Sequence, residues 1–322
     1  MTVIRIGARR SPLAVAQAEW VRHWLVGLGA ECEIIGIDTQ GDTDRRHLTE
    51  IGGTGVFAMA VREALADGRI DVAVHSMKDL PTAPLPGLEI AAVPEREDPS
   101  DVLVGCRLAQ LTDGMVIGTG SPRRQVQLAA YAAARGIDIE FRPIRGNVET
   151  RLGLVRSGEI SATLLAAAGL RRLGFDVLPN LPIHEALLPD VMLPAAAQGA
   201  LAVEIAEPAR PGVRDLVARL DHAPTRARVT AERAFLRELE AGCLAPVGVL
   251  ASVKSEHDNG IDLTLSAVIG KTFGSTSDSD GSSDALLGIQ GTSDAETAAE
   301  LGARLARAAL VRINEDKTSG PA

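Results

Sequence analysis

The order of apolar and polar residues changes in a regular way through about the first 205 positions of the chain. Short apolar runs of strand length alternate with longer segments in which apolar residues recur every three or four positions, as on one face of a helix. This alternation is typical of α/β domains, in which helices cover a mostly parallel sheet. The expected strands are residues 3–7, 33–37, 70–75, 138–143 and 160–167, and the apolar segment 193–205 ends as a strand.

The helices expected between these strands carry recognisable end signals. Residues 57–67 have an apolar face and run up to Gly68, which suits the left-handed position after a helix. Asn147 is placed to cap a helix that runs to about Arg156. The first helix is expected to bury one face made of Leu13, Ala16, Gln17, Trp20, Val21, Trp24 and Leu28.

The opening pattern of the chain occurs twice. VIRIGARRSP contains Ser11 and resembles MVIGTGSPRR, which contains Ser121, 110 residues later. Both run from a strand through a glycine to Ser-Pro, a common helix start in which serine caps and proline occupies the first turn. With the polar, proline-bearing stretch 94–101 between them, the two segments predict two α/β domains with similar openings.

From about residue 220 the pattern changes to that of a small α+β unit. Its low-complexity stretch at 274–283 has the composition of a mobile loop. The expected elements are a helix at 225–240, strands at 247–254 and 261–269, and a final amphipathic helix at about 295–312.

Composition and charge narrow the function classes. A net charge of −9 and an aromatic content of 2% argue against binding to nucleic acid, which needs a basic surface and stacking platforms. The chain has no apolar run of membrane-spanning length, and its first residues lack the pattern of a secretory signal. Its three cysteines are scattered and its six histidines lack metal-binding spacing, so we expect free thiols, a cytoplasmic location and no metal site.

Arginine is strongly preferred over lysine, since only four of the 33 basic residues are lysines. Two arginine pairs stand at predicted helix starts, Arg9–Arg10 before the first Ser-Pro and Arg123–Arg124 after the second. The helix dipole disfavours cations there, whereas an anion would be bound by backbone N–H groups and guanidinium groups together. Solvent-directed side chains would explain one such pair, but two pairs at equivalent positions favour anion binding.

Further arginines lie near predicted strand ends, where α/β proteins bind their ligands. Each alone is compatible with an ordinary solvated side chain, but together they favour a ligand with several carboxylates or phosphates. Arg171 is expected to face solvent more than its neighbour. The set comprises Arg142, Arg145, Arg151, Arg171 and Arg172.

The segment HSMKDLP follows a buried-type strand and brings Lys78 and Asp79 to its carboxyl end. Lys78 is the only lysine before residue 254, which hints at a specific role. Asp79 is placed to act as a general acid or base, or to stabilise a developing cation. A surface Lys–Asp pair of little energetic value is the alternative, and the residues alone do not decide between the two.

Two loops complete the candidate chemistry. GGTG at 52–55 opens a helix but lacks the features of a phosphate-binding loop. Cys243 lies in AGCLAP, in a turn between a helix and a strand where thiols are often accessible, whereas Cys32 and Cys106 suit the role of small buried apolar residues.

Nine short motifs follow one another across nearly the whole chain: RxSPLA, GGxGxF, DxAVHSMKDLP, EREDPxD, IGTxSxRRQ, RGNVxTR, AGLxRLG, PAxxQGAxxxE and GCxxPxG. Together they make the chain resemble the porphobilinogen deaminase family, and the match is highly specific. The resemblance implies two α/β domains similar to the halves of periplasmic binding proteins, around a cleft, and a small α+β domain with the cysteine loop. The expected boundaries are 1–98 with 199–219, then 99–198, then 220–322.

The resemblance also implies an activity. The family joins four porphobilinogen molecules head to tail with loss of ammonia, on a dipyrromethane cofactor held by a thioether, and water finally releases hydroxymethylbilane. Cys243 matches the anchoring cysteine and Asp79 the catalytic aspartate, which would stabilise the electron-poor azafulvene left by ammonia. The expected binding partner is the small molecule porphobilinogen, and neither nucleic acid nor a membrane is expected to be bound. The enzyme is expected to be a monomer.

Each pyrrole carries an acetate and a propionate, so the resemblance assigns arginines and nearby polar side chains to carboxylates. Cofactor binding is assigned to Ser76, Lys78, Thr119, Ser121, Arg123 and Arg124. Substrate and chain binding is assigned to Arg9, Ser11, Arg145, Arg151 and Arg172, with Gln198 at the interdomain crossing and Phe57 after the glycine loop.

The chain departs from the family pattern at three places. Thr54 stands where members often have lysine, Ala197 where glycine is frequent, and 274–283 resembles an insertion. The main alternative function is a non-catalytic, two-lobed module that closes arginines on a small polyanion. Such a binder would not need both Cys243 and Asp79. A second alternative is a phosphoryl-handling enzyme, but the sequence lacks the phosphate loop and the obvious carboxylate cluster for Mg²⁺ that such an enzyme needs.

Overall fold

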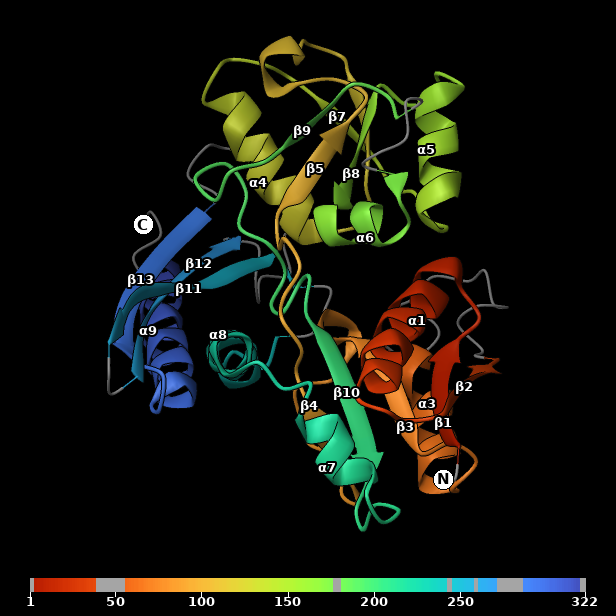
Figure 1. The fold of residues 1–322 in the computed structure, drawn as a ribbon. Coiled ribbons are helices and arrows are strands. Elements are labelled where there is room, and N and C mark those ends of the chain that lie inside the picture. The colour runs from red at the N-terminus through yellow and green to blue at the C-terminus, as the bar shows by residue number, and fades with distance from the viewer. Residues whose placement is uncertain are drawn as a thin grey trace. The chain divides into compact units, whose positions relative to one another are not determined.

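The computed structural model describes residues 3–38, 56–175, 181–241, 245–257, 260–270 and 286–318, except for the side chains of 56–57, 256–257 and 316–318. These residues form two five-stranded sheets and one three-stranded sheet, with helices packed on them (Figure 1). The predicted fold class, two α/β domains and a small α+β unit, is therefore confirmed. Contacts between residues divide the chain into two compact units. The first is Met1–Glu97 with Gly199–Ala227, and the second is Asp98–Gln198 with Arg228–Ala322. The boundaries of the three domains expected from the sequence stay a prediction.

The sheet of the first unit has the strand order β2-β1-β3-β10-β4. β1 is parallel to β2 and β3, whereas β10 comes from much later in the chain and is antiparallel to both of its neighbours. The carboxyl ends of β1 and β3 therefore share one edge of the sheet. The elements are β1 (Ile4–Arg9), α1 (Pro12–Gly27), β2 (Cys32–Ile37), α3 (Val56–Ala66), β3 (Val72–Ser76), the 3-10 helix η1 (Met77–Asp79), β4 (Leu88–Ala92), β10 (Leu201–Ala206) and α7 (Val213–Ala218).

The first sheet of the second unit has the order β7-β6-β8-β5-β9, with β6 parallel to β7 and β8, and β5 antiparallel to β8 and β9. The spatial order and directions of the strands are those of the first sheet, so the expected repeat of two α/β domains with similar openings is confirmed, although the antiparallel strand is the last of its sheet in the chain in one case (β10) and the first in the other (β5). The elements are β5 (Asp101–Val104), the 3-10 helix η2 (Leu108–Gln110), β6 (Val116–Gly118), α4 (Pro122–Ala133), β7 (Glu140–Arg142), α5 (Val148–Arg156), β8 (Ala162–Ala166), α6 (Ala167–Arg172) and β9 (His184–Ala186).

Both α/β sheets are covered on two faces by helices. In the first unit α1 and α7 pack on one face, and α3 packs on the other around Ala73. In the second unit α4 and α5 take the corresponding places. The expected face of α1 is partly wrong, because Ala18 and Leu25 are buried while Trp24 is 51% exposed and lies against the ring of Trp20.

The second unit also contains the antiparallel sheet β11-β12-β13. α9 packs against this sheet, and Gly302 of α9 fits closely against the backbone of α8 at Ala231 and Phe235. The elements are α8 (Ala223–Glu238), β11 (Val247–His257), β12 (Gly260–Gly270), β13 (Leu286–Asp294) and α9 (Ala298–Thr318).

Most predicted elements are present with ends shifted by a few residues. Gly68 has a φ of +68° after α3, and Asn147 accepts the N–H of Thr150 at the start of α5, so both end signals are confirmed. The patterns did not predict β4, β5, β9, β13, α6 or α7. The stretch 274–283 lies outside the described residues.

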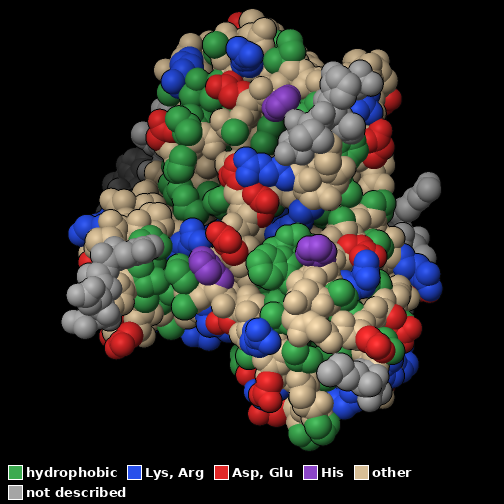
Figure 2. Space-filling model, viewed as in Figure 1, with side chains coloured by type: hydrophobic (Ala, Val, Ile, Leu, Met, Phe, Trp, Pro, Cys, Tyr) green, Lys and Arg blue, Asp and Glu red, His purple; other side chains and the backbone are tan. Residues whose placement is uncertain are grey.

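Acidic and basic side chains are interspersed on the visible face of the molecule, in keeping with the mixed composition (Figure 2). Among the described helices, none has both the length and the apolar character needed to cross a membrane.

Ala197 adopts a left-handed backbone conformation with a φ of +58°. A glycine would adopt this conformation at lower cost, because a Cβ is disfavoured there. The buried carboxylate of Glu232 holds the segment by accepting the N–H of Ala197 at 2.6 Å and that of Ala251 at 2.9 Å.

We expect Ala197→Gly to be less destabilising than Ala196→Gly. Both remove a buried methyl group, but only the first also relieves a left-handed alanine, which is worth about 1–2 kcal/mol. In thermal unfolding followed by circular dichroism, the midpoint of Ala197→Gly should lie at least about 2 °C above that of Ala196→Gly. Equal midpoints would mean that the left-handed conformation stores no strain.

Candidate functional site

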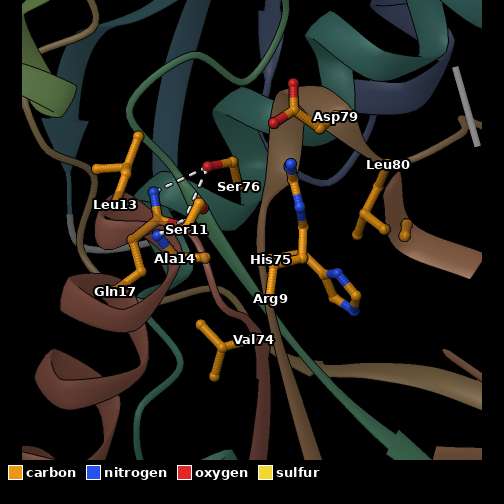
Figure 3. Close-up of a pocket in the computed structure, with 11 residues that line it drawn as sticks. Arg9, Ser11, Leu13, Ala14, Gln17, Val74, His75, Ser76, Asp79 and Leu80 are labelled. Atoms are coloured by element: carbon orange, nitrogen blue, oxygen red, sulfur yellow. Dashed lines mark hydrogen bonds between the residues drawn. The ribbon is translucent and has the colours of Figure 1, made fainter. Parts of the chain in front are cut away.

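A pocket in the first unit lies at the shared carboxyl edge of β1 and β3 (Figure 3). Because the two strands are parallel neighbours, the segments that follow them come together at this edge. Four residues assigned to the site from the sequence line it, and three of them come directly from the ends of these strands or from η1. The lining residues are Arg9, Ser11, Leu13, Ala14, Gln17, Ala58, Val74, His75, Ser76, Asp79 and Leu80.

The cationic and anionic groups of this pocket come from different strands. Arg9 is the last residue of β1, and Asp79 ends η1 directly after β3. Figure 3 shows the side chain of Arg9 extending towards the carboxylate of Asp79. Ser11 caps α1 by accepting the N–H of Ala14 at 3.4 Å, as predicted. A guanidinium group and a carboxylate in one pocket can bind an acidic substituent and stabilise a nearby positive charge.

Gln17 is a site residue that the sequence reasoning missed. Its side chain is buried and makes two hydrogen bonds with Ser76, donating to Oγ at 2.8 Å and accepting from it at 3.1 Å (Figure 3). The pattern placed Gln17 on the buried face of α1, and an amide on an otherwise apolar face was the available signal. Lys78 is half-buried beside Asp79 but is not one of the described residues that line this pocket.

A second cluster of predicted residues lies in the second unit, around the fully buried Asp101 at the start of β5. Arg123 donates from Nη1 to Asp101 at 2.6 Å, and Arg124 donates to it from Nε at 2.9 Å and from Nη2 at 2.7 Å. Burial alone would raise the pKa of Asp101, but the charges and hydrogen bonds of the two arginines hold it well below its ordinary value. Gln198 also donates to this carboxylate, at 3.1 Å.

The two arginine pairs at helix starts are used differently. Arg10 is largely exposed and pairs with the exposed carboxylate of Asp38 at 2.7 Å. Arg123 and Arg124 instead point inwards, and each also donates to a backbone carbonyl, at 2.8 Å to Leu193 and at 2.7 Å to Leu164.

Arg151 adds a third positive charge near this cluster. Burial and the neighbouring charge of Arg124 lower the pKa of Arg151 to about 10. Its Nε donates to the carbonyl oxygen of Gly146 at 3.0 Å. An anion bound beside these two arginines would relieve their repulsion, so the residues present suit a ligand that carries carboxylates.

The remaining predicted residues of the second unit are more scattered. Thr119 is buried, and its hydroxyl accepts the N–H of Ser121 at 3.2 Å. Ser121 holds the N-cap position of α4, but its hydroxyl makes no capping bond, unlike the prediction. Arg145 is exposed after β7, and Arg172 is half-buried at the end of α6. Arg171 is the more exposed of its pair, as predicted.

Several predicted features lie outside the described residues. They are Cys243, the side chain of Phe57 and the glycine loop 52–55 with Thr54.

Two family models match the chain over most of its length. Residues 4–211 match "Porphobilinogen deaminase, dipyromethane cofactor binding domain", and residues 226–310 match "Porphobilinogen deaminase, C-terminal domain". The chain is 51% identical over 278 residues to "Porphobilinogen deaminase 1" of Streptomyces coelicolor, covering 85% of both chains. It is 46% identical over 329 residues to "Porphobilinogen deaminase" of Acidothermus cellulolyticus, covering 98% of this chain and 91% of that one.

Solved structures of binding proteins give looser matches. The aliphatic sulphonate binding protein SsuA of Escherichia coli aligns with 13% identity and a TM-score of 0.38, over 74% of this chain and 75% of that one. The methionine binding protein MetQ aligns with 11% identity and a TM-score of 0.41, over 68% and 89%.

We expect Asp101→Asn to destabilise the protein strongly. The substitution leaves two buried arginines without their negative partner, and breaking a buried ion pair typically costs about 3–5 kcal/mol. Glu149→Gln is the control, because Glu149 pairs with Arg156 at 2.8 Å on the surface and such pairs contribute less than about 1 kcal/mol. Thermal unfolding should separate the two variants by several degrees, and similar midpoints would contradict a structural role for Asp101.

Proposed function

Because the chain belongs to the porphobilinogen deaminase family, we propose that it joins four porphobilinogen molecules head to tail, releases ammonia at each step and frees hydroxymethylbilane by hydrolysis. It is a transferase of tetrapyrrole biosynthesis with a dipyrromethane cofactor-binding domain. The observation that supports this reaction best is the pocket in which Arg9, Ser11 and Asp79 converge.

Asp79 is the proposed catalytic carboxylate. When the protonated aminomethyl group of porphobilinogen loses ammonia, the C–N bond breaks and its electron pair leaves with the nitrogen. The remaining pyrrole then carries a positive charge. A carboxylate beside the pyrrole N–H stabilises that charge as it develops, and electrostatic stabilisation of this kind is a large contribution to catalysis. The position of Asp79 on a short 3-10 helix, between a buried strand and the buried Leu80, supports this role because it restricts the backbone that carries the carboxylate.

The cationic cluster of the second unit is the proposed holder of the cofactor carboxylates. The bound dipyrromethane supplies the pyrrole carbon on which the product chain is built. Arg123 and Arg124 are already oriented by Asp101, so little side-chain freedom is lost when a carboxylate binds. Ser76, Lys78, Thr119 and Ser121 are proposed as further cofactor ligands, and Cys243 as the thioether anchor.

The carboxylates of substrate and growing chain are assigned to a second group of residues. Arg9 and Ser11 belong to the pocket, and Arg151 is a cation whose pKa is lowered by burial and by a like charge, as expected where an anion is to bind. Arg145, Arg172, Gln198 and Phe57 complete the proposed group.

We also infer that the enzyme works as a monomer in the cytoplasm. Cys32 and Cys106 are free thiols, which suits a reducing compartment. The three sheets support the three-domain division at 1–98 with 199–219, 99–198 and 220–322.

The mass of the denatured protein tests the anchor. Wild-type protein is expected to carry the extra mass of two linked pyrroles, and Cys243→Ser should lack it, because an alcohol does not form the thioether. Wild-type protein without the extra mass would be incubated with porphobilinogen before it is measured again. A mass that stays unchanged, with no ammonia released, would favour the non-catalytic polyanion-binding module.

Asp79→Ala tests the catalytic carboxylate. We expect this variant to keep its fold and its covalent mass when produced as loaded protein, but to lose at least about 99% of turnover, the lower end of what one charge-stabilising group contributes. Ammonia release per loaded molecule is the measurement. Turnover near that of the wild type would remove Asp79 from the mechanism.

A further inference from the structure

A buried cluster of three ionisable side chains lies under the pocket of the first unit. Glu204 of β10 accepts from Arg62 of α3 at 2.9 Å and 2.7 Å, and Nε2 of His75 lies 3.1 Å from its Oε2. The three side chains are only 3–6% exposed. Neither the pocket chemistry nor the cofactor cluster uses Glu204 or Arg62, although His75 and Glu204 both belong to motifs of this sequence.

The cluster is built across two strands and a helix. β3 and β10 are antiparallel, with Ala202 opposite His75 and Ala73 opposite Glu204, so the two polar side chains are diagonal neighbours on the face that α3 covers. Burial alone would raise the pKa of Glu204, but the close contact with Nε2 of His75, the hydrogen bonds from Arg62 and the charges of these two groups lower it to about 2, so the carboxylate is ionised at neutral pH.

This cluster holds the end of β3 from one side, and other bonds hold it from the remaining directions. Ser76, the next residue, bonds to Gln17 on the opposite face of the sheet. The N–H of Met77 donates to the carbonyl oxygen of Ala200 at 3.0 Å. Three consecutive residues are thus fixed immediately before Lys78 and Asp79, and His75 itself lines the pocket (Figure 3).

A similar cluster at the other end of the same strand provides the comparison. Asp71, just before β3, has a side chain only 4% exposed and pairs with Arg5 at 2.8 Å and with Arg210 at 3.0 Å. It lies outside the residues that line the pocket. Both clusters stabilise the strand, but only the one around Glu204 is joined to the segment that carries Asp79.

We propose that Glu204, held by Arg62, is a positioning residue that acts through His75 to fix the carboxylate of Asp79 in the pocket. The inference rests on the proposed catalytic role of Asp79. Displacing a catalytic group by about 1 Å can reduce a rate by about 100-fold, so holding the preceding strand end has a direct kinetic consequence.

The test uses loaded enzyme, with the covalent mass confirmed for each variant. Glu204→Gln keeps the shape of the side chain but removes its charge, and His75→Leu removes the ring nitrogen. We expect both to lower kcat by about 10- to 100-fold with KM changed by less than about threefold. His75→Gln can place an amide N–H near the position of Nε2 and should recover kcat to within about fivefold of the wild type.

Asp71→Asn is the matched control for the loss of a buried carboxylate on the same strand. It should lower the thermal unfolding midpoint about as much as Glu204→Gln while kcat per loaded molecule stays at the wild-type value. If kcat falls in Asp71→Asn as far as in Glu204→Gln, or if Glu204→Gln turns over normally, the positioning role is overturned.

Two further comparisons keep the outcomes distinct. If Glu204→Gln does not fold, the kcat values of His75→Leu and His75→Gln are compared instead. Equal kcat values for these two variants would reject the role of His75. Asp79→Ala separates this inference from the proposed function: an active Asp79→Ala variant would overturn both, whereas an inactive one beside a fully active Glu204→Gln would overturn only the positioning role.

Discussion

Each α/β sheet contains a buried carboxylate on its antiparallel strand, and the surrounding helices are tied to the sheets through these two charges. Glu204 lies on β10 and Asp101 on β5, both almost without solvent contact. A buried carboxylate is stable only when it is paired and hydrogen-bonded, so each draws arginine side chains inwards from a helix. Arg62 links α3 to the first sheet in this way, and Arg123 and Arg124 link α4 to the second.

The charges of the two carboxylates are neutralised to different degrees. This difference matches the two proposed roles, positioning of Asp79 by the Glu204 cluster and binding of carboxylates by the Asp101 cluster. Glu204 has one arginine and one histidine, a balanced set that leaves little attraction for another anion. Asp101 faces two arginines, and Arg151 lies close enough to Arg124 for its pKa to be lowered. The second cluster therefore keeps an excess of positive charge that suits a substrate and cofactor with many carboxylates, whereas the first serves the geometry of a strand.

Local signals made much of the fold predictable, and long-range pairing accounts for most of what was not. The Asn147 cap and Gly68 depend on neighbouring residues only, as does the Ser-Pro repeat that revealed two related sheets. By contrast, Arg62 and Glu204 are 142 residues apart, so their pairing depends on β10 entering the first sheet. β13 was missed because glycines interrupt its alternation, and Gly291 is explained only by the close approach of Leu305 from α9. Pocket residues at strand ends were predicted because the edge of a parallel sheet gathers them, but the inward direction of Arg123 and Arg124 followed from Asp101, to which no role had been given.

The position of β10 between β3 and β4 has a consequence for how the chain is made. Both of these strands are synthesised before residue 93, but the strand that pairs with both begins only at Leu201. Every strand of the sheet β7-β6-β8-β5-β9, in contrast, lies within residues 98–198. During translation this second sheet can therefore be complete while the edges of β3 and β4 are still unpaired. The nascent chain must keep those edges from pairing wrongly until β10 leaves the ribosome. The first sheet, whose synthesis begins earlier, is therefore completed after the second sheet.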